Sequence, residues 1–281
     1  MRQPHVAIVC ADEPRRMEAV RAFDGAPPEW RITLHDVPPP DADLVVSADG
    51  SEGDVRFEPG RTQGLLAEVS ELLRPPPAVI GVVGSSGGCG ATSVALHLAA
   101  SLAGPVCFLD ASTDAAASFR LGIHDDLDIE GAARDEPVPV CGGFRYVAAR
   151  SEGLAEVLAR ACAGFESVVV DAPSARLKEL APHVTSAVLL MLPTPSSAGR
   201  AAELLALHDE LEWAVVTNRL GPGGETGAAE LRRIIGRRIT LHLPCSPGLR
   251  DAEDDDGLLT SGWSPWRRGV ERLGRAVVEH R

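Results

Sequence analysis

Several residue types and patterns are scarce in this chain of 281 residues. It has a single lysine, Lys178, a single tyrosine, Tyr146, and only 4% aromatic residues. No run of about 18 uncharged apolar residues occurs, so the sequence predicts no membrane-spanning helix. The first residues, MRQPHVAIVCADEP, lack the basic start and the long apolar run of a secretory signal peptide. We therefore expect a cytoplasmic protein.

The cysteines and the net charge exclude further classes. The six cysteines are scattered, without a C-x-x-C pair or a histidine at zinc-ligand spacing, so the sequence predicts neither a disulfide scaffold nor a structural zinc site. The formal net charge is −13, whereas affinity for nucleic acid depends on clustered lysine and arginine. We therefore expect no specific nucleic-acid partner, although several arginines gather in the last fifty residues.

The composition, with 44% hydrophobic and 24% charged residues, is that of a folded protein. Residues 1–74 show the pattern strand, helix, strand, strand, helix. Three prolines follow at 75–77, and because proline cannot continue a helix and stiffens the chain, we place a linker and a domain boundary there. We predict a small α/β module over residues 1–74 and a second domain over residues 78–281.

From residue 78 onward, apolar strands alternate with helical patterns. The strands, such as AVIGVVG and SVVVDAP, are near-continuous runs of small and branched apolar residues. Such strands belong to a parallel sheet that helices cover on both faces. We therefore predict a doubly wound α/β domain with a mostly parallel sheet.

A glycine-rich turn joins the first of these strands to the first helix. Residues 84–90 read GSSGGCG, and Ala91, Thr92 and Ser93 open the helix. Glycines let backbone N–H groups turn inward, and the helix N-terminus adds partial positive charge, so this layout is typical of a phosphate-binding loop. The turn alone leaves open that its glycines serve only the packing of strand and helix in another doubly wound fold.

Three later segments narrow this interpretation. One strand ends at Asp110, another ends in VVVDAP with Asp171, and a late strand ends in Asn218 and Arg219. Together with the glycine-rich turn, these ordered motifs make residues 78–281 resemble the MinD/ParA family of P-loop ATPases. The resemblance implies the deviant-Walker P-loop NTPase fold, with ATP and Mg²⁺ as cofactors.

The resemblance also implies roles for individual residues. The phosphate-binding loop takes in Gly87, Gly88, Cys89, Gly90, Ala91, Thr92 and Ser93. Thr92 and Asp171 take the positions of magnesium ligands. Asp110 takes that of the catalytic aspartate that positions the attacking water. Asn218, with its neighbour Arg219, takes that of the residue that reads adenine.

Both lysines of the family's loop are missing. The signature lysine, which reaches across a dimer to the partner's nucleotide, falls on Ser86, and the phosphate-gripping lysine falls on Ala91. Stabilisation of the charge on a transferring phosphoryl group is most of what such an enzyme supplies. The sequence therefore predicts ATP binding with slow hydrolysis at most, unless an arginine fills in.

This departure points to one branch of the family. A loop of the form G-G-x-G-A-[ST]-[ST] is similar to that of the CpaE/TadZ proteins, pilus-localisation relatives of MinD with an atypical Walker A loop. Their actinobacterial members are CpaE-like or septum-site-determining proteins. The resemblance implies a homodimer that recruits a secretion-type or pilus-type ATPase, or another membrane-associated assembly, in the cytoplasm or at the inner face of the membrane.

The same branch often has a receiver-like N-terminal domain, and residues 1–74 resemble a shortened one. A phosphorylated receiver needs an aspartate at the end of its third strand and a lysine. Here the third-strand position falls on Ser47 or Ala48, Asp49 follows, and the segment has no lysine. We therefore predict a pseudo-receiver used for docking.

Two other functions stay open. A short-chain dehydrogenase shares the glycine spacing and would use Asp110 for an NAD ribose, but it needs a Tyr-x-x-x-Lys pair, and Tyr146 is followed by Arg150. A scaffold that has lost nucleotide binding altogether is compatible with the missing lysines. Cys89, inside the loop, is either a small spacer, which we favour, or an activated thiol.

The C-terminus has three interpretations. The last 19 residues, from Trp263, predict a basic amphipathic helix with Trp266, Val270, Leu273 and Val277 on one side. MinD relatives lay such a helix on anionic lipid, and ParA relatives hold DNA with basic patches. Alternatively, the helix packs on its own sheet while its arginines face water. The tryptophans next to arginines favour a peripheral membrane contact over DNA.

Overall fold

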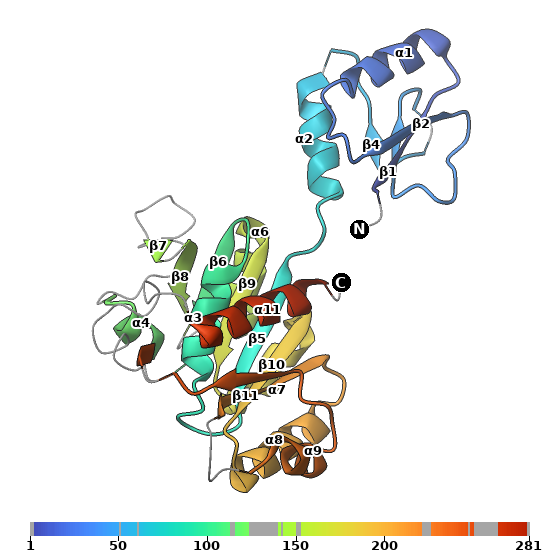
Figure 1. Cartoon of the computed structure of the whole chain (residues 1–281). Coiled ribbons are helices and arrows are strands. Elements are labelled where there is room, and N and C mark those ends of the chain that lie inside the picture. Colours follow the sequence, from blue (N-terminus) through green and yellow to red (C-terminus); the bar gives the residue numbers. More distant parts are fainter. Residues whose placement is uncertain are drawn as a thin grey trace. The chain divides into compact units, whose positions relative to one another are not determined.

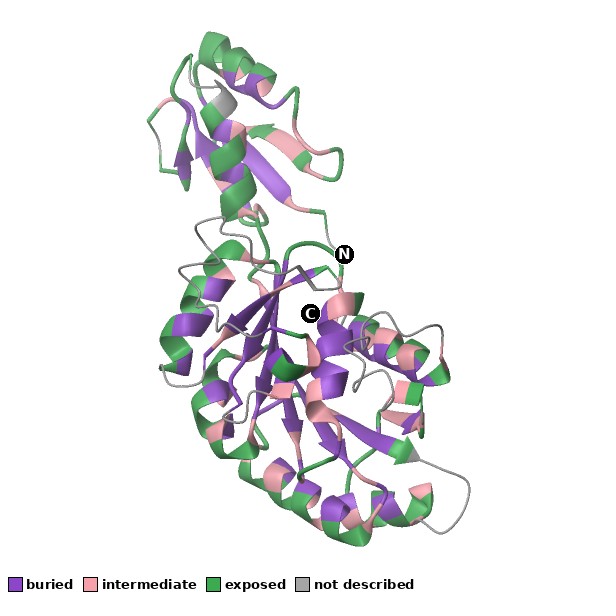
Figure 2. Cartoon of the chain, turned by 90° about the vertical axis from the view of Figure 1, so that its left-hand side faces the viewer, coloured by how far each residue is buried: buried purple, intermediate pink, exposed green. Residues whose placement is uncertain are grey.

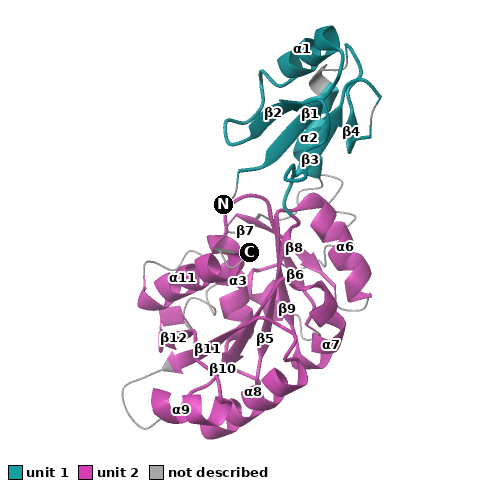
Figure 3. Cartoon of the chain, turned by 90° about the vertical axis from the view of Figure 1, so that its right-hand side faces the viewer, with its two compact units in different colours: residues 1–75 teal, residues 76–281 magenta. Residues whose placement is uncertain are grey.

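The computed structural model describes residues 3–50, 52–60, 62–112, 116–123, 140–141, 143–149, 153–220, 226–246, 248–249 and 264–279. The chain divides into two compact units, Met1–Pro75 and Pro76–Arg281 (Figure 3). The boundary between them falls inside the run of three prolines. Among the described residues, no helix is both long and apolar enough to cross a membrane.

Unit 1 is a small parallel sheet with two helices. Its strands are β1 (His5–Val9), β2 (Arg31–His35), β3 (Leu44–Ser47) and β4 (Val55–Arg56), in the order β2-β1-β3-β4, and its helices are α1 (Glu13–Ala22) and α2 (Thr62–Leu72). Alternate residues of β1, Val6 and Ile8, pack with Phe23 after α1 and Leu65 of α2 in one core. The two-residue strand β4 is an element that the sequence pattern does not predict.

The connections of unit 1 bear on its predicted likeness to a receiver. Within the described residues, the links from β2 to β3 and from β3 to β4 carry no helix, so this unit has fewer helices than strands. The carboxylate of Asp49, just beyond β3, accepts a hydrogen bond from the backbone N–H of Ala11 at 2.8 Å. Asp49 thus ties the ends of β1 and β3 together. The pseudo-receiver assignment stays a prediction.

Unit 2 is built on one large sheet in the order β12-β11-β10-β5-β9-β6-β8-β7 (Figure 1). Seven strands are parallel, and β7 is antiparallel to β8. The strands are β5 (Ala78–Gly84), β6 (Val106–Asp110), β7 (Val140–Cys141), β8 (Phe144–Ala148), β9 (Ser167–Ala172), β10 (Ser186–Met191), β11 (Trp213–Leu220) and β12 (Leu241–Pro244). The predicted α/β fold with a mostly parallel sheet is confirmed.

Helices cover both faces of this sheet. They are α3 (Ala91–Ser101), α4 (Ala116–Arg120), α6 (Leu154–Gly164), α7 (Leu177–Leu180), α8 (Pro195–Leu207), α9 (Ala228–Ile235) and α11 (Pro265–Glu279). Side chains alternate along each strand, so Ile80 and Val82 of β5 pack on the side of α3 and α11, whereas Val79 packs on the side of α6. Burial on both faces explains the near-continuous apolar strands (Figure 2).

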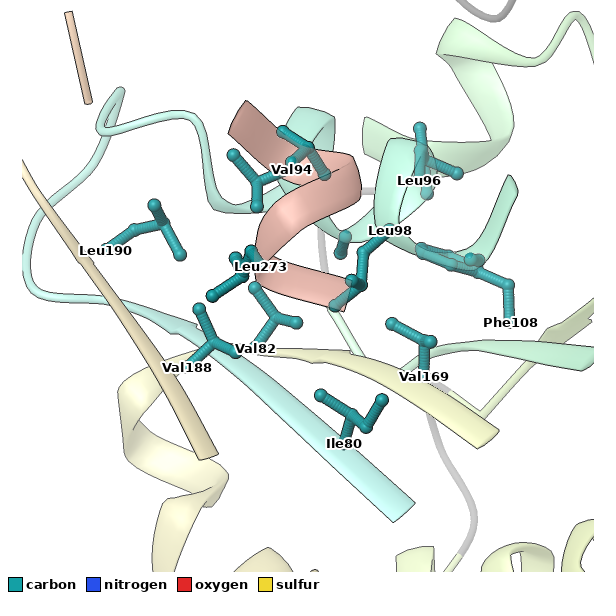
Figure 4. Close-up of a cluster of buried hydrophobic side chains, with 14 of the residues drawn as sticks. Ile80, Val82, Val94, Leu96, Leu98, Phe108, Val169, Val188, Leu190 and Leu273 are labelled. Atoms are coloured by element: carbon teal, nitrogen blue, oxygen red, sulfur yellow. The ribbon is translucent and has the colours of Figure 1, made fainter. Parts of the chain in front are cut away.

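The C-terminal helix α11 belongs to the core of unit 2. Its apolar side chains Trp266, Val270, Leu273 and Val277 are all buried and share a cluster with α3 and the central strands. Figure 4 shows Leu273 among side chains of α3, β5 and β10. The apolar side is therefore not available to a bilayer, and the interpretation of a helix packed on its own sheet is the one the structure bears out. The exposed arginines of α11 are Arg268, Arg272 and Arg275.

Candidate functional site

The glycine-rich loop lies between β5 and α3, at the carboxyl edge of the parallel strands. Gly88 and Gly90 have positive φ angles of 71° and 87°. A side chain is unfavourable at Gly90 for two reasons. The φ angle is positive, and a Cβ atom would clash with Nδ2 of Asn218. Gly90 is the N-cap of α3, so the loop lies at the N-terminus of this helix, where the helix dipole contributes partial positive charge.

A cavity of about 460 Å³ opens at this loop. It is lined by residues 84–93, Ser112, Ala116, Arg120, Asp171, Ala172, Pro173, Ser174, Arg200 and Arg219. The structure thus brings together most of the predicted binding residues, from Gly87 to Ser93 together with Asp171 and Arg219. Asp110 and Asn218 are not among the lining residues.

The lining is locally positive in an acidic protein. Its described residues include three arginines and one aspartate, a formal charge of +2, whereas the whole chain carries −13. Sequence reasoning missed Arg120 and Arg200, because they come from α4 and α8, far along the chain from the loop. A concave site with this charge, at a helix N-terminus, suits an anionic ligand.

Asp171 and Thr92, the predicted magnesium ligands, both line the cavity. Asp171 lies near the end of β9, in register with Val82 of β5 and Asp110 of β6, and its side chain is buried. Thr92 is the second residue of α3. Among the described residues, no group of three or more histidine, cysteine, aspartate or glutamate side chains forms a metal site. One carboxylate and one hydroxyl fit Mg²⁺, which takes few protein ligands and completes its shell with phosphates and water.

Asp110 ends β6 as predicted, but its carboxylate is engaged within the protein. Its side chain is 0% exposed. Oδ2 accepts a hydrogen bond from the Tyr146 hydroxyl at 2.9 Å, and Oδ1 accepts from the backbone N–H of Ser112 at 3.0 Å and from the Ser112 hydroxyl. The geometry therefore does not favour the predicted role of Asp110 in positioning water. Ser112, rather than Asp110, reaches the cavity.

The same contact weakens the dehydrogenase alternative. Tyr146 is fully buried between strands, its ring stacks on Phe108 with centroids 6.0 Å apart, and its hydroxyl is used by Asp110. A catalytic tyrosine must reach substrate, and this one cannot. Arg150, the residue in place of the dehydrogenase lysine, lies outside the described residues.

Asn218 joins three parts of the unit. Its amide Nδ2 donates to the carbonyl of Cys89 in the loop at 2.8 Å. Its Oδ1 accepts from the indole Nε1 of Trp266 in α11 at 2.9 Å and from the backbone N–H of Arg219 at 2.9 Å. The adenine-reading role of Asn218 stays a prediction. Its contacts give it a second task, to hold the loop, α11 and the end of β11 in register.

Serines tie the start of the loop to α8. The hydroxyl of Ser197 lies 2.8 Å from that of Ser85 and 3.2 Å from that of Ser86, and it accepts from the backbone N–H of Leu192 at 2.9 Å. Ser86, at the position predicted for the signature lysine, therefore makes its contact inside its own chain. No local pattern predicts this cluster, because Ser197 lies in a helix about 110 residues later.

Arg176 braces the turn that follows Asp171. Its guanidinium donates to the carbonyl of Ala149 at 2.7 Å and pairs with Glu179, whose carboxylate accepts from the backbone N–H of Leu154 at 2.6 Å. The hydrogen bond from Arg176 lowers the pKa of Glu179. This chain of contacts connects the site turn with the first residue of α6.

Cys89 is expected to be inert in the folded protein. Its thiol is buried, and that burial raises its pKa, so the reactive thiolate is scarce near neutral pH. Cys245 is exposed after β12. Iodoacetamide at pH 8, followed by peptide mass mapping, should label Cys245 in the native protein and Cys89 only after denaturation. Rapid native labelling of Cys89 would instead support the activated-thiol interpretation.

The chain matches no protein-family model and no curated protein. Solved structures do share its fold. The cell division ATPase MinD of Pyrococcus furiosus superposes with a TM-score of 0.61 at 16% identity, covering 73% of this chain and 99% of that chain. The MinC:MinD cell division protein complex of Aquifex aeolicus gives 0.61 at 17% identity, covering 72% and 96%.

A third structure is a variant of McdA from Cyanothece in complex with ATP, with a TM-score of 0.56 at 15% identity, covering 72% of this chain and 96% of that chain. Unit 2 makes up a similar share of the chain. At these identities the similarity establishes the fold. This chain therefore has the MinD/ParA P-loop NTPase fold, in which the cavity at the glycine-rich loop lies after the first strand of unit 2.

Proposed function

We propose that unit 2 binds ATP with Mg²⁺ in the cavity at the glycine-rich loop. The observation that carries this proposal is the positive lining of that cavity in a chain of net charge −13, at the N-terminus of α3. The backbone N–H groups from Gly87 to Ser93 hold the phosphates. Thr92 and Asp171 hold the metal ion, and the base lies toward Asn218. The McdA complex with ATP, which shares the fold, supports this choice of ligand.

Hydrolysis is expected to be slow. The loop has no lysine, because Ser86 and Ala91 stand in the two lysine positions, and Lys178 is not among the residues lining the cavity. The Asp110 carboxylate is held by Tyr146 and Ser112. Catalysis of phosphoryl transfer depends on positioned cations and an oriented nucleophile. Bound Mg²⁺ would neutralise phosphate charge, and the chain's own residues are suited to bind and orient the nucleotide more than to turn it over.

A nucleotide that is bound but slowly hydrolysed suits a localisation or regulatory protein. We assign the chain to the CpaE/TadZ-like branch, acting as a homodimer that recruits a pilus-type or secretion-type ATPase, or an assembly for septum placement, in the cytoplasm or at the membrane's inner face. A neighbour in fold has been solved with a partner, as the MinC:MinD complex. Unit 1 serves as a docking pseudo-receiver, a role supported by the engagement of Asp49 with the Ala11 backbone.

Equilibrium binding of ATP to the full chain tests this function. Calorimetry with and without Mg²⁺ is expected to give micromolar, magnesium-dependent binding. Gly90→Ala should raise the dissociation constant at least tenfold, about 1.4 kcal/mol, because its Cβ would displace the Asn218 amide. The matched control is Gly164→Ala at the end of α6, which does not line the cavity. A Cβ at Gly164 meets no atom within 4 Å, so this variant should bind nearly as the wild type does.

Two results would contradict the proposal. If millimolar ATP and ADP show no binding to the wild-type protein, the chain is a nucleotide-free scaffold built on an ATPase fold. If Gly90→Ala binds ATP as tightly as Gly164→Ala does, the ligand does not lie against the glycine-rich loop.

A further inference from the structure

Cations at the cavity come from outside the glycine-rich loop. The loop itself has none, and Lys178 lies in α7, where it lines a different cavity with Leu207 and His208. The positive side chains that do line the loop cavity are all arginines, from α4, from α8 and from the end of β11. If only backbone N–H groups bound the phosphates, the phosphates would have no fully charged cation as a partner. These arginines are the candidates to supply that cation.

Arg219 is the most firmly placed of the three. It follows Asn218 at the end of β11, and its φ of 62° makes it the only non-glycine residue of the described chain with a positive φ. Such a backbone is unfavourable for a side chain of this size and persists where surrounding contacts impose it. Here the backbone N–H of Arg219 donates to Oδ1 of Asn218, and Nδ2 of the same Asn218 side chain donates to the carbonyl of Cys89. One side chain thus fixes Arg219 relative to the loop.

The guanidinium of Arg219 lines the cavity. The side chain is exposed and makes no hydrogen bond or ion pair with any residue that the structure describes. Arg176, by comparison, is engaged with a carbonyl and a carboxylate. A strained backbone that presents to a cavity a guanidinium with no partner among the described residues is suited to a planar, bidentate contact with phosphate oxygens.

Arg200 lines the cavity from α8. It lies in α8 three residues after Ser197, so the two side chains share a face of the helix. Ser197 is bonded to Ser85 and Ser86, which places this face against the start of the loop. Arg200 is also exposed and without an ion pair to a described residue. Arg200 and Arg219 therefore line the same cavity from two different elements, α8 and β11.

We propose that Arg219, assisted by Arg200, supplies the cationic phosphate contact that the loop of this chain lacks. The inference rests on the proposed function, since it assigns residues to the same nucleotide site. The ligand class is a nucleoside triphosphate recognised through its phosphates. Because Arg219 contacts the phosphates and not the base, we expect its substitution to change phosphate affinity without changing recognition of the base.

The test is calorimetry on the full chain with ATP, inorganic tripolyphosphate and adenosine as separate probes. Arg219→Ala is expected to raise the dissociation constants of ATP and tripolyphosphate at least tenfold and that of adenosine less than twofold. Arg219→Lys keeps a cation and should lose less than Arg219→Ala. The control Arg272→Ala removes the same charge from the exposed side of α11 and should change ATP affinity less than twofold.

Arg219→Gly distinguishes the effect of losing the side chain from any effect of the strained backbone. It relieves the positive φ, so it should fold at least as well as the wild type, yet lose phosphate affinity like Arg219→Ala. If the wild type binds ATP while Arg219→Ala and Arg219→Gly bind it as tightly as Arg272→Ala does, the inference is wrong and the proposed function stands. If the wild type binds no ATP, the proposed function fails first, and the inference with it.

Discussion

Replacement of Trp266 by alanine is expected to lower the free energy of unfolding of unit 2 by about 3–5 kcal/mol. Trp266 is one of the largest fully buried side chains, at 1% exposure, in the cluster that α11 shares with α3. Its ring lies edge-on to His97 with centroids 4.8 Å apart, and its indole N–H donates to Asn218. Since the free energy of unfolding of a whole domain is about 5–15 kcal/mol, the variant should lose a large part of its stability. Urea denaturation followed by circular dichroism measures the change.

Trp266→Phe separates the two contributions. It keeps most of the buried aromatic surface but removes the indole N–H, so we expect a smaller loss of about 1–3 kcal/mol from the unpaired Oδ1 of Asn218 and the missing ring. A loss below about 1 kcal/mol for Trp266→Ala would show that α11 is not part of the core in solution. In that case the helix would again be available for a membrane surface.

The second large effect is expected at Asn218. Asn218→Asp keeps the shape of the side chain but replaces the donor that faces the Cys89 carbonyl with an oxygen, and it introduces a buried charge. Loss of that hydrogen bond and desolvation of the carboxylate should lower the free energy of unfolding by about 3–5 kcal/mol at pH 7. ATP affinity should fall as well, because the bond that fixes the loop to β11 is lost. Urea denaturation and calorimetry measure the two effects.

Asn218→Ala gives the comparison. It removes all three hydrogen bonds of the side chain without adding a charge, and its loss is expected to be smaller than that of Asn218→Asp, about 2–3 kcal/mol. If the free energy of unfolding of Asn218→Asp instead lies within about 0.5 kcal/mol of that of the wild type, the amide contact with Cys89 does not stabilise the loop. If both variants also bind ATP as tightly as the wild type, Asn218 does not affect binding at the loop.

The fold of unit 2 could be predicted from the sequence because its signals are local. Apolar strands, helical spacing and the glycine-rich turn each occupy a short continuous segment, and the order of these segments along the chain specifies a parallel sheet. The loop residues from Gly87 to Ser93 and Asp171 then come together in one cavity. The same local reasoning missed β4 and the antiparallel strand β7, which are only two residues long.

The partners of buried polar groups could not be predicted in this way. Asp110 ends its strand as expected, but whether its carboxylate faces the cavity depends on Tyr146, which comes from another strand. The apolar side of α11 is equally compatible with lipid and with a protein core, because both are apolar environments. Arg200 reaches the site only through the packing of α8 on the loop. These are contacts of tertiary structure, for which spacing along the chain holds no signal.

Asn218 has one more consequence, for spectroscopy. It is the only asparagine in the chain. Protein labelled with ¹⁵N only in the asparagine side-chain amide will therefore give one pair of NH₂ signals in a nuclear magnetic resonance spectrum. Because that amide donates to the loop and its oxygen accepts from α11 and Arg219, the pair reports on all three at once. Ligand binding at the loop can therefore be followed through this one pair of NH₂ signals, without a substitution to introduce a probe.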